Sequence, residues 1–326
     1  MSAWLLPSVE LRDFADVVQQ IARERLDRHV DALERDDRIP DAAHEVLVEN
    51  GLWALGIPAD GEPVDLLALV VAVAEIATAM PAAALAIVDV HLLALAAPHD
   101  DILLERLRGG GYGAWLSGPA VTVTSDAARV REARCCFGGE GVAGLVVDER
   151  AVLVDGDGWT TRTRTAVVSR SGMRGAPAPA VSLDAAGQPS HVDPDTGRAL
   201  RSLLLAAIGA GLATAATAHA TAYAAERRQF GGPIASIPSV SARLQDVSSR
   251  AQTLRQAVVD ATNAPRSSAA DRVATLVSRT LVPLTCDCLQ VLGGYGYLEE
   301  YPLARIVRDA ISLQAQIAST RAPSLR

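Results

Sequence analysis

Lysine is absent from this chain of 326 residues, so its basic side chains are arginines and six histidines. Acidic residues outnumber arginines, and the net charge is −8 at pH 7. The sequence also lacks a block of basic residues that could follow a phosphate backbone, so binding to nucleic acid is not expected. Aromatic residues make up only 4% of the chain and give no indication of the shape of a ligand.

Cysteine is scarce, and its four copies lie in two close pairs, Cys135 with Cys136 and Cys286 with Cys288. Neither pair has the spacing of a zinc site, and no nearby histidines complete one, so we expect no metal. Cysteines this close rarely bond to each other, and free thiols are typical of a reducing compartment. The N-terminus lacks the basic stretch and apolar core of a signal peptide. The sequence therefore predicts a cytoplasmic protein.

Uninterrupted apolar segments of membrane-spanning length are almost absent. The stretch 66–97 is broken by Glu75, Asp89 and His91, which argues against a lipid environment. Residues 202–225 contain no Asp, Glu, Lys or Arg and are long enough to cross a bilayer. They consist mostly of Ala, Gly and Thr, however, and small residues suit close packing between helices better than contact with lipid. We therefore predict a buried bundle helix and no membrane span.

The chain contains helical, strand-rich and helical segments in that order. Residues 1–110 predict an N-terminal helical domain, because apolar residues recur at helical spacing. Residues 111–196 predict a small antiparallel β-domain, in which Gly, Asp and Pro clusters separate short apolar runs. Residues 197–326 predict a C-terminal four-helix bundle. The expected fold class is therefore α+β and mostly helical.

The individual elements can be predicted with approximate bounds. The helices are expected at 9–33, 41–50, 66–80, 82–95, 103–108, 196/198–228, 240–261, 271–292 and 302–317. The strands are expected at 120–124, 144–148, 151–155, 165–169 and 180–183. Pro81 separates two of the helices, since proline removes a backbone donor from a helix interior.

Two glycine-containing motifs lie in the last third of the chain. Residues 226–231 read Glu-Arg-Arg-Gln-Phe-Gly, and residues 290–296 read Gln-Val-Leu-Gly-Gly-Tyr-Gly. A glycine lets the backbone approach a ligand closely, because it has no Cβ. In order and approximate spacing, the two motifs resemble the C-terminal helical domain of the acyl-CoA dehydrogenase family. Such enzymes use FAD to desaturate acyl-CoA thioesters between Cα and Cβ.

The resemblance implies a set of FAD-binding residues on this chain. In that family the C-terminal helices of one subunit hold the pyrophosphate and adenine of the neighbour's FAD. Arg227 matches the family's phosphate-binding arginine, whose planar guanidinium can bind two phosphate oxygens. From the residues alone, Arg227 is equally compatible with a surface ion pair, and the glycine pair with a helix cap. The full set implied by the resemblance is Arg227, Gln229, Phe230, Gln290, Gly293 and Gly294.

Other parts of the family pattern are missing. The segment that usually faces the flavin ring reads Leu-Ser-Gly-Pro at residues 116–119. The resemblance places the catalytic glutamate at Ile317 or, in some members, at or beside Arg201. Neither side chain can do the work of a carboxylate, which the abstraction of a proton next to a thioester requires. Glu299 and Glu300 are the nearest acids, at positions where the family has structural surface residues.

The resemblance therefore implies a subunit that serves a neighbour's FAD and carries no catalytic residue of its own. Actinobacterial members that process sterol side-chain CoA thioesters form such mixed assemblies, with fewer flavins than subunits. We expect an α2β2 assembly with a second acyl-CoA dehydrogenase-like subunit that keeps the catalytic glutamate. The further expected partners are an acyl-CoA substrate and an electron-transferring flavoprotein.

Two alternatives stay open at this point. A stand-alone enzyme with altered chemistry would use another acid, such as Asp60, Glu62 or Glu140. A flavin-free scaffold or binding protein would retain the helical bundle alone, and removal of the Arg227 charge would then leave the flavin content of the complex unchanged.

Overall fold

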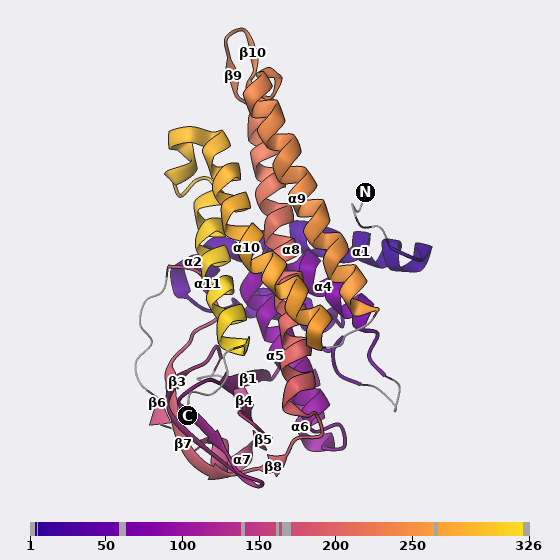
Figure 1. Cartoon of the computed structure of the whole chain (residues 1–326), viewed down its shortest axis with the longest axis vertical. Coiled ribbons are helices and arrows are strands. Elements are labelled where there is room, and N and C mark those ends of the chain that lie inside the picture. The colour runs from indigo at the N-terminus through magenta and orange to yellow at the C-terminus, as the bar shows by residue number, and fades with distance from the viewer. Residues whose placement is uncertain are drawn as a thin grey trace.

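The computed structural model describes residues 4, 6–58, 63–137, 141–160, 163–164, 171–263 and 267–321. Helices, strands and helices follow one another along the chain, as predicted (Figure 1). The sheets lie at one end of the molecule, and the long helices α8 (Pro194–Glu226) to α11 (Leu303–Arg321) extend away from them. A hairpin of β9 (Arg228–Gln229) and β10 (Gly232–Pro233) forms the tip at the opposite end. The domain boundaries at 110/111 and 196/197 remain predictions.

The first N-terminal helix is more broken than the sequence predicts. Instead of one helix over 9–33, α1 (Val9–Ile21) is followed by a π-turn, η1 (Ala22–Leu26), a 3-10 turn, η2 (Asp27–His29), and α2 (Val30–Asp36). Val18, Ala22, Leu26 and Val30 are all buried, at a constant spacing of four residues. That spacing exceeds the ~3.6 residues of an α-helical turn, and the wider π-turn keeps these side chains facing the core.

The other N-terminal helices lie within a few residues of their predicted bounds. They are α3 (Asp41–Glu49), α4 (Leu66–Ala77), α5 (Pro81–Ala96) and α6 (Asp101–Arg108). Pro81 is the first residue of α5, a position at which proline needs no hydrogen-bond donor. The side chain of Asp65 caps α4 by accepting from the backbone N–H groups of Leu67 and Ala68.

Two four-stranded sheets form the β-region, in the orders β1-β4-β5-β8 and β2-β3-β7-β6. The prediction of a purely antiparallel domain is wrong, because β1 pairs with β4 in parallel. After β1 the chain builds β2 and β3 in the other sheet and then returns in the same direction, which permits the parallel pairing. The strands are β1 (Tyr112–Ser117), β2 (Val121–Val123), β3 (Ala127–Arg134), β4 (Gly141–Val147), β5 (Ala151–Val154), β6 (Thr163–Arg164), β7 (Ala180–Ala186) and β8 (Gln188–Pro189).

The sequence pattern does not predict β1 or β3, for different reasons. The middle of β1 is buried on both faces, so the strand has no alternation of apolar and polar residues. The inward residues of β3 include Ala128 and Ala133, and alanine favours strands only weakly. One of the Gly and Asp clusters, at residues 155–158, is not a simple loop, because a short helix, α7 (Gly156–Thr160), begins within it. The predicted strand 165–169 lies outside the described residues.

The C-terminal part is a bundle of α8, α9 (Pro238–Thr262), α10 (Ser267–Leu292) and α11, with α8 at its centre. A Cβ added to Gly211 would lie 2.2 Å from the backbone oxygen of Ala74 in α4, and one added to Gly209 would lie 2.3 Å from Val277 in α10. The small residues of α8 thus permit close packing on both sides, as predicted. By length and composition α8 could cross a membrane, but 89% of its apolar window is buried inside the protein.

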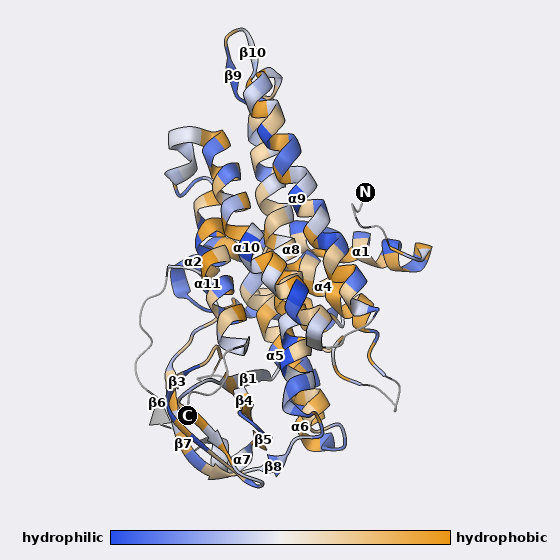
Figure 2. Ribbon diagram, in the orientation of Figure 1, coloured by the Kyte–Doolittle hydropathy of each residue, from blue (hydrophilic) through white to orange (hydrophobic). Residues whose placement is uncertain are grey.

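One large apolar core joins the N-terminal helices to the bundle, and a smaller one lies between the two sheets. The large core also contains an ion pair, in which Arg255 of α9 donates to Glu75 of α4 at 2.8 Å. Trp4 and Gln19 donate to the two oxygens of the same carboxylate. In contrast to this interior, β9 at the tip of the molecule is hydrophilic (Figure 2).

Candidate functional site

The hairpin β9–β10 presents an exposed aromatic ring. Gln229 pairs with Gly232, so Phe230 and Gly231 form a two-residue turn. Both turn residues have positive φ, 52° for Phe230 and 86° for Gly231. Such turns favour Asn, Asp or Gly at the first position, and a bulky residue there is strained. Phe230 is nevertheless 95% exposed, so packing within the chain does not explain it. Strain of this kind is typical of functional positions.

Arg227 lies at the base of the same hairpin and contacts an aromatic group from another part of the chain. Its guanidinium carbon lies 5.0 Å from the centre of the Tyr295 ring, a cation–π contact. Tyr301 packs edge-on against both Tyr223 and Tyr295, which fixes the ring that supports Arg227. Within the described part of the chain Arg227 forms no ion pair, so its N–H groups can bind an anion from outside.

Tyr295 belongs to η4 (Gly293–Tyr297), a 3-10 turn that follows α10 and contains the glycine pair. Gly293 has a φ of +58°, which ends the helix in the left-handed region. A Cβ added to Gly293 or Gly294 would meet nothing within 4 Å, so both glycines face open space. Gln290 is exposed in the last turn of α10. The contact between Arg227 and Tyr295 thus brings the two sequence motifs together.

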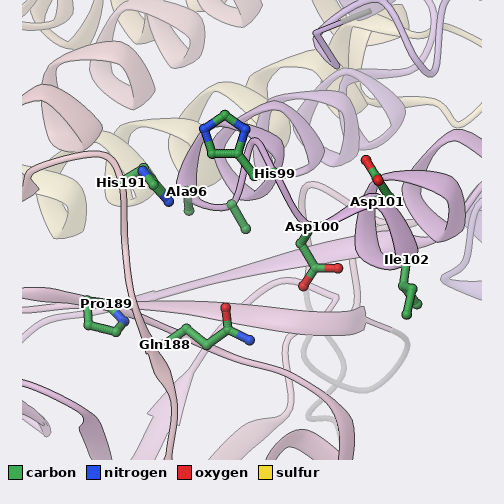
Figure 3. A pocket seen from close by; sticks show the side chains of 9 residues that line it. Ala96, His99, Asp100, Asp101, Ile102, Gln188, Pro189 and His191 are labelled. Atoms are coloured by element: carbon green, nitrogen blue, oxygen red, sulfur yellow. The ribbon is translucent and has the colours of Figure 1, made fainter.

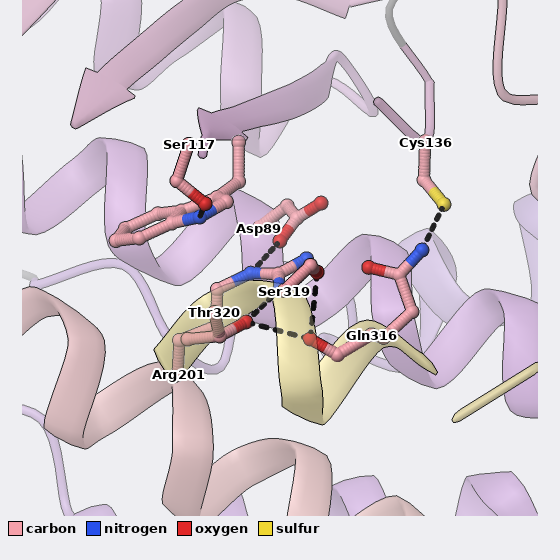
Figure 4. Close-up of polar contacts among 8 residues, drawn as sticks. Asp89, Ser117, Cys136, Arg201, Gln316, Ser319 and Thr320 are labelled. Atoms are coloured by element: carbon pink, nitrogen blue, oxygen red, sulfur yellow. Dashed lines mark hydrogen bonds and ion pairs between the residues drawn. The ribbon is translucent and has the colours of Figure 1, made fainter. Parts of the chain in front are cut away.

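The two positions that the resemblance assigns to a catalytic glutamate are both buried. Ile317 is 1% exposed, on α11. Arg201, on α8, donates from its Nη1 to the hydroxyl of Thr320 at 2.6 Å, one helical turn after Ile317 (Figure 4). Its Nε donates to Asp89 Oδ1 of α5 at 3.2 Å. Its guanidinium carbon also lies 5.4 Å from the ring of Trp115 in β1. Four different elements therefore meet at Arg201.

The Arg201–Asp89 ion pair is almost completely removed from solvent, with side-chain exposures of 3% and 0%. Burial raises the pKa of Asp89, and the positive charge of Arg201 opposes that effect. Oδ2 of Asp89 has no hydrogen-bond partner among the described residues. In the sequence, Asp89 is only an interruption of an apolar run. A carboxylate in a helix that is apolar apart from His91 is the signal that could have revealed a buried cation opposite it.

The remaining acids discussed from the sequence do not join this cluster. Glu299 and Glu300 are exposed in the turn between η4 and α11. Asp60, Glu62 and Glu140 lie outside the described residues. No group of three or more His, Cys, Asp or Glu side chains within the described ranges could hold a metal ion.

A separate hollow of 490 Å³ lies where α5, α6 and β8 approach one another (Figure 3). His99 and His191 meet edge-on there, with ring centres 5.4 Å apart. Asp100 lines the hollow but also caps α6, since its Oδ1 accepts from the backbone N–H of Leu103. The hollow contains none of the residues predicted to bind FAD, and we assign no ligand to it.

Two family models match the chain. The acyl-CoA dehydrogenase N-terminal domain matches residues 8–99, and the acyl-CoA dehydrogenase C-terminal domain matches residues 200–315. An acyl-CoA dehydrogenase of Bacillus subtilis is 37% identical over 111 residues, which cover 32% of this chain and only 29% of that relative. An acryloyl-CoA reductase (NADH) of Anaerotignum propionicum is 25% identical over 347 residues, covering 90% of this chain and 87% of that protein.

The fold has a solved counterpart of nearly the same extent. A glutaryl-CoA dehydrogenase of Mycobacterium smegmatis in complex with FADH2 superimposes with a TM-score of 0.81 at 16% identity, over 96% of this chain and 92% of that one. The two matched domains together make up more than half of the sequence and lie in the expected order. This chain therefore belongs to the acyl-CoA dehydrogenase family.

Proposed function

We propose that this chain is a subunit of a FAD-dependent acyl-CoA dehydrogenase and contributes FAD-binding contacts to a partner subunit that carries the catalytic glutamate. The observation that carries the proposal is the buried ion pair between Arg201 and Asp89. A guanidinium has only donors and stays protonated in proteins, so Arg201 cannot accept a proton from a substrate. Ile317 has no polar atom. Neither position can therefore act as a base.

The exposed residues fit a dinucleotide that approaches from another chain. Arg227 is held against Tyr295 without a carboxylate partner in the described ranges, as a phosphate-binding arginine would be. Gly293 and Gly294 leave open space next to their backbone, and Phe230 extends from the tip. We assign Gln229 and Gln290 to the same contact surface, since both are exposed beside these residues in sequence. When bound, FAD would supply the acceptor for the electrons removed from the substrate.

The length of α8 supports the proposal that these residues contact a FAD that is held by a neighbouring subunit. The helix runs without interruption from Arg201 to its end just before Arg227. At ~1.5 Å per residue, the two positions are about 39 Å apart along the helix axis. A single dinucleotide with its flavin next to Arg201 could not reach Arg227 of the same chain.

The region that would face a flavin of this chain's own is engaged in internal contacts. The indole N–H of Trp115 donates to the hydroxyl of Ser117 at 2.9 Å, and Arg201 lies over the same indole. Ser117 belongs to the 116–119 segment, where the family pattern is missing. These contacts fit a subunit whose own flavin-facing region no longer carries out the reaction.

The substrate and the electron acceptor belong to the same proposal. The reaction would be the α,β-desaturation of a CoA thioester, with a sterol side chain as the proposed acyl group. An electron-transferring flavoprotein would accept the electrons. The names of proteins similar to this chain refer to CoA thioesters with different acyl groups, so they do not select one acyl group. The sterol assignment rests on the pattern of missing residues.

Co-expression tests the proposal directly. This chain would be produced alone and together with an acyl-CoA dehydrogenase-like protein that has the catalytic glutamate, and flavin per subunit would be measured from the visible spectrum. We expect little flavin on this chain alone, and fewer flavins than subunits in the mixed assembly. A yellow homo-oligomer that is bleached by acyl-CoA would show instead that the chain is a complete enzyme.

A matched pair of variants distinguishes the proposal from a flavin-free scaffold. Arg227→Ala should weaken FAD retention by about 1.5–3 kcal/mol, the usual contribution of hydrogen bonds to charged groups. Arg228→Ala removes the same charge from an exposed neighbour on β9 and should leave FAD retention unchanged. If both variants retain FAD as the unmodified assembly does, the chain does not contact the cofactor.

A further inference from the structure

The helices α2 and α11 run beside each other (Figure 1). Residues of both helices line a hollow of 730 Å³. Its half-buried lining contains three arginines, Arg174, Arg305 and Arg308, with one acid, Glu34, and the ring of Tyr301. The inner part of the hollow is therefore positively charged, although the protein as a whole is acidic. A local excess of arginine in a concave site favours an anionic ligand.

Two of these arginines have unused hydrogen-bonding capacity. Arg308 is occupied, because it donates to the carbonyl of Ser171 at 2.6 Å and pairs with Glu34 at 3.6 Å. Arg174 and Arg305 form no ion pair within the described part of the chain. Nη2 of Arg174 donates to the carbonyl of Arg35 at 3.4 Å, but its Nε is buried without a hydrogen-bond partner there. A buried donor of this kind is costly unless a ligand satisfies it, and phosphate oxygens match the guanidinium geometry.

The segment that carries Arg174 is attached to the helices on both sides. The backbone N–H of Met173 donates to Asp309 of α11 at 2.6 Å. The backbone N–H of Gly175 donates to Asp37, at the end of α2, at 3.0 Å. These two anchors flank Arg174 and hold its backbone in place. A binding group that is fixed before the ligand arrives loses less entropy when it binds.

We propose that this hollow binds an adenosine diphosphate group, with the phosphates on Arg174 and Arg305 and the base against Tyr297, a lining residue that is 74% exposed. Tyrosine stacks on any base and suits a nucleotide better than a bare phosphate. The group could come from a free nucleotide or from the nucleotide end of CoA. The site requires neither FAD nor the second subunit, so it goes beyond the function proposed above.

The rim of the hollow provides a test that depends on the sign of the charge. Asp31 and Glu299 are exposed there and repel a phosphate. If an anion binds, Glu299→Gln should raise its affinity by about twofold to fivefold, as expected for one exposed charge. A change that merely disturbed the structure would not improve binding.

Calorimetric titration of the purified assembly, saturated with FAD so that the flavin site is filled, would measure binding. The probes are ADP, CoA, inorganic pyrophosphate and adenosine. We expect ADP and pyrophosphate to bind, adenosine not to bind, and all binding to weaken with salt. CoA binding more tightly than ADP would identify the thioester carrier as the source, and the reverse order would identify a free nucleotide.

Variants link the binding to the hollow. Arg174→Gln with Arg305→Gln should weaken ADP about tenfold or more. Arg272→Gln removes the same charge from an exposed site on α10 and should have no effect. Flavin content should be unchanged in the double variant, in Arg272→Gln and in Glu299→Gln, which separates this inference from the FAD proposal. Absence of ADP and pyrophosphate binding at millimolar concentration, or loss of binding only in Arg227→Ala, would overturn it.

Discussion

Nε of Arg201 lies 3.2 Å from Oδ1 of Asp89, and this contact joins α8 to α5 in a place that solvent does not reach. Arg201→Met should reduce the free energy of unfolding by about 3–5 kcal/mol, because it leaves a buried carboxylate without its cation. Adding Asp89→Asn should recover a substantial part of that loss. Urea denaturation of the four proteins of this mutant cycle would measure the coupling.

A surface pair provides the control for this cycle. Arg129 and Asp184 are 2.8 Å apart, but both are more than half exposed. Arg129→Met should therefore cost no more than about 1 kcal/mol. If Arg201→Met costs as little as Arg129→Met, then the interior pair does not hold the helices together.

Phe230→Asn should have opposite effects on folding and on cofactor binding. Asparagine tolerates the positive φ at this position better than phenylalanine, so stability should stay the same or rise by up to about 1 kcal/mol. FAD retention by the assembly should fall, since the exposed ring is lost. Thermal unfolding and flavin content would be measured on the same preparation. Unchanged flavin content would remove Phe230 from the proposed contact surface.

The two adjacent glycines should differ in their contribution to stability. Gly293→Ala forces a side chain into the left-handed region and should destabilise the chain by about 1–2 kcal/mol. Gly294→Ala has open space and no positive φ, so it should leave stability unchanged. Both should weaken FAD retention if the backbone approaches the dinucleotide. Equal thermal midpoints for the two variants would contradict the conformational argument.

Asp309 should make stability depend on pH in the mildly acidic range. Burial raises the pKa of this carboxyl to about 6 and outweighs the hydrogen bond from the N–H of Met173, which lowers the pKa. The folded state therefore keeps a proton between pH 4 and 6 that the unfolded chain has released. The contribution of Asp309 is fully present below pH 4 and is lost as the pH rises through 6.

Asp309→Asn tests this sign. The stability of the unmodified protein minus that of the variant should fall by up to about 3 kcal/mol between pH 4 and pH 7. Urea midpoints at several pH values would give the two curves. Parallel curves would show that the carboxyl titrates normally.

The architecture was accessible from the sequence because it depends on local signals. Helical periodicity, the helix start at Pro81 and the small residues of α8 predict the helices and their packing. The two C-terminal motifs predict that residues 227–230 and 290–294 serve one ligand, and the contact between Arg227 and Tyr295 brings these two segments together. These predictions need only residues that are close in the chain or part of a recognised motif.

Features that depend on distant contacts could not be predicted in this way. Asp89 forms a buried ion pair with Arg201, which is far away in sequence and on another helix. The parallel pairing of β1 with β4 depends on the path of the chain through the second sheet. The left-handed turn at Phe230 contradicts the preference of the residue itself, so no propensity would indicate it.

The environment of Arg201 also limits how this lineage could change. A mutation to glutamate at residue 201 would place two like charges face to face in the dry interior, next to the hydroxyl of Thr320. Introducing an acid there thus requires a simultaneous change at Asp89, because either single change leaves a buried charge without its partner. The proposed absence of a base at this position would then be maintained by protein stability rather than by selection on catalysis.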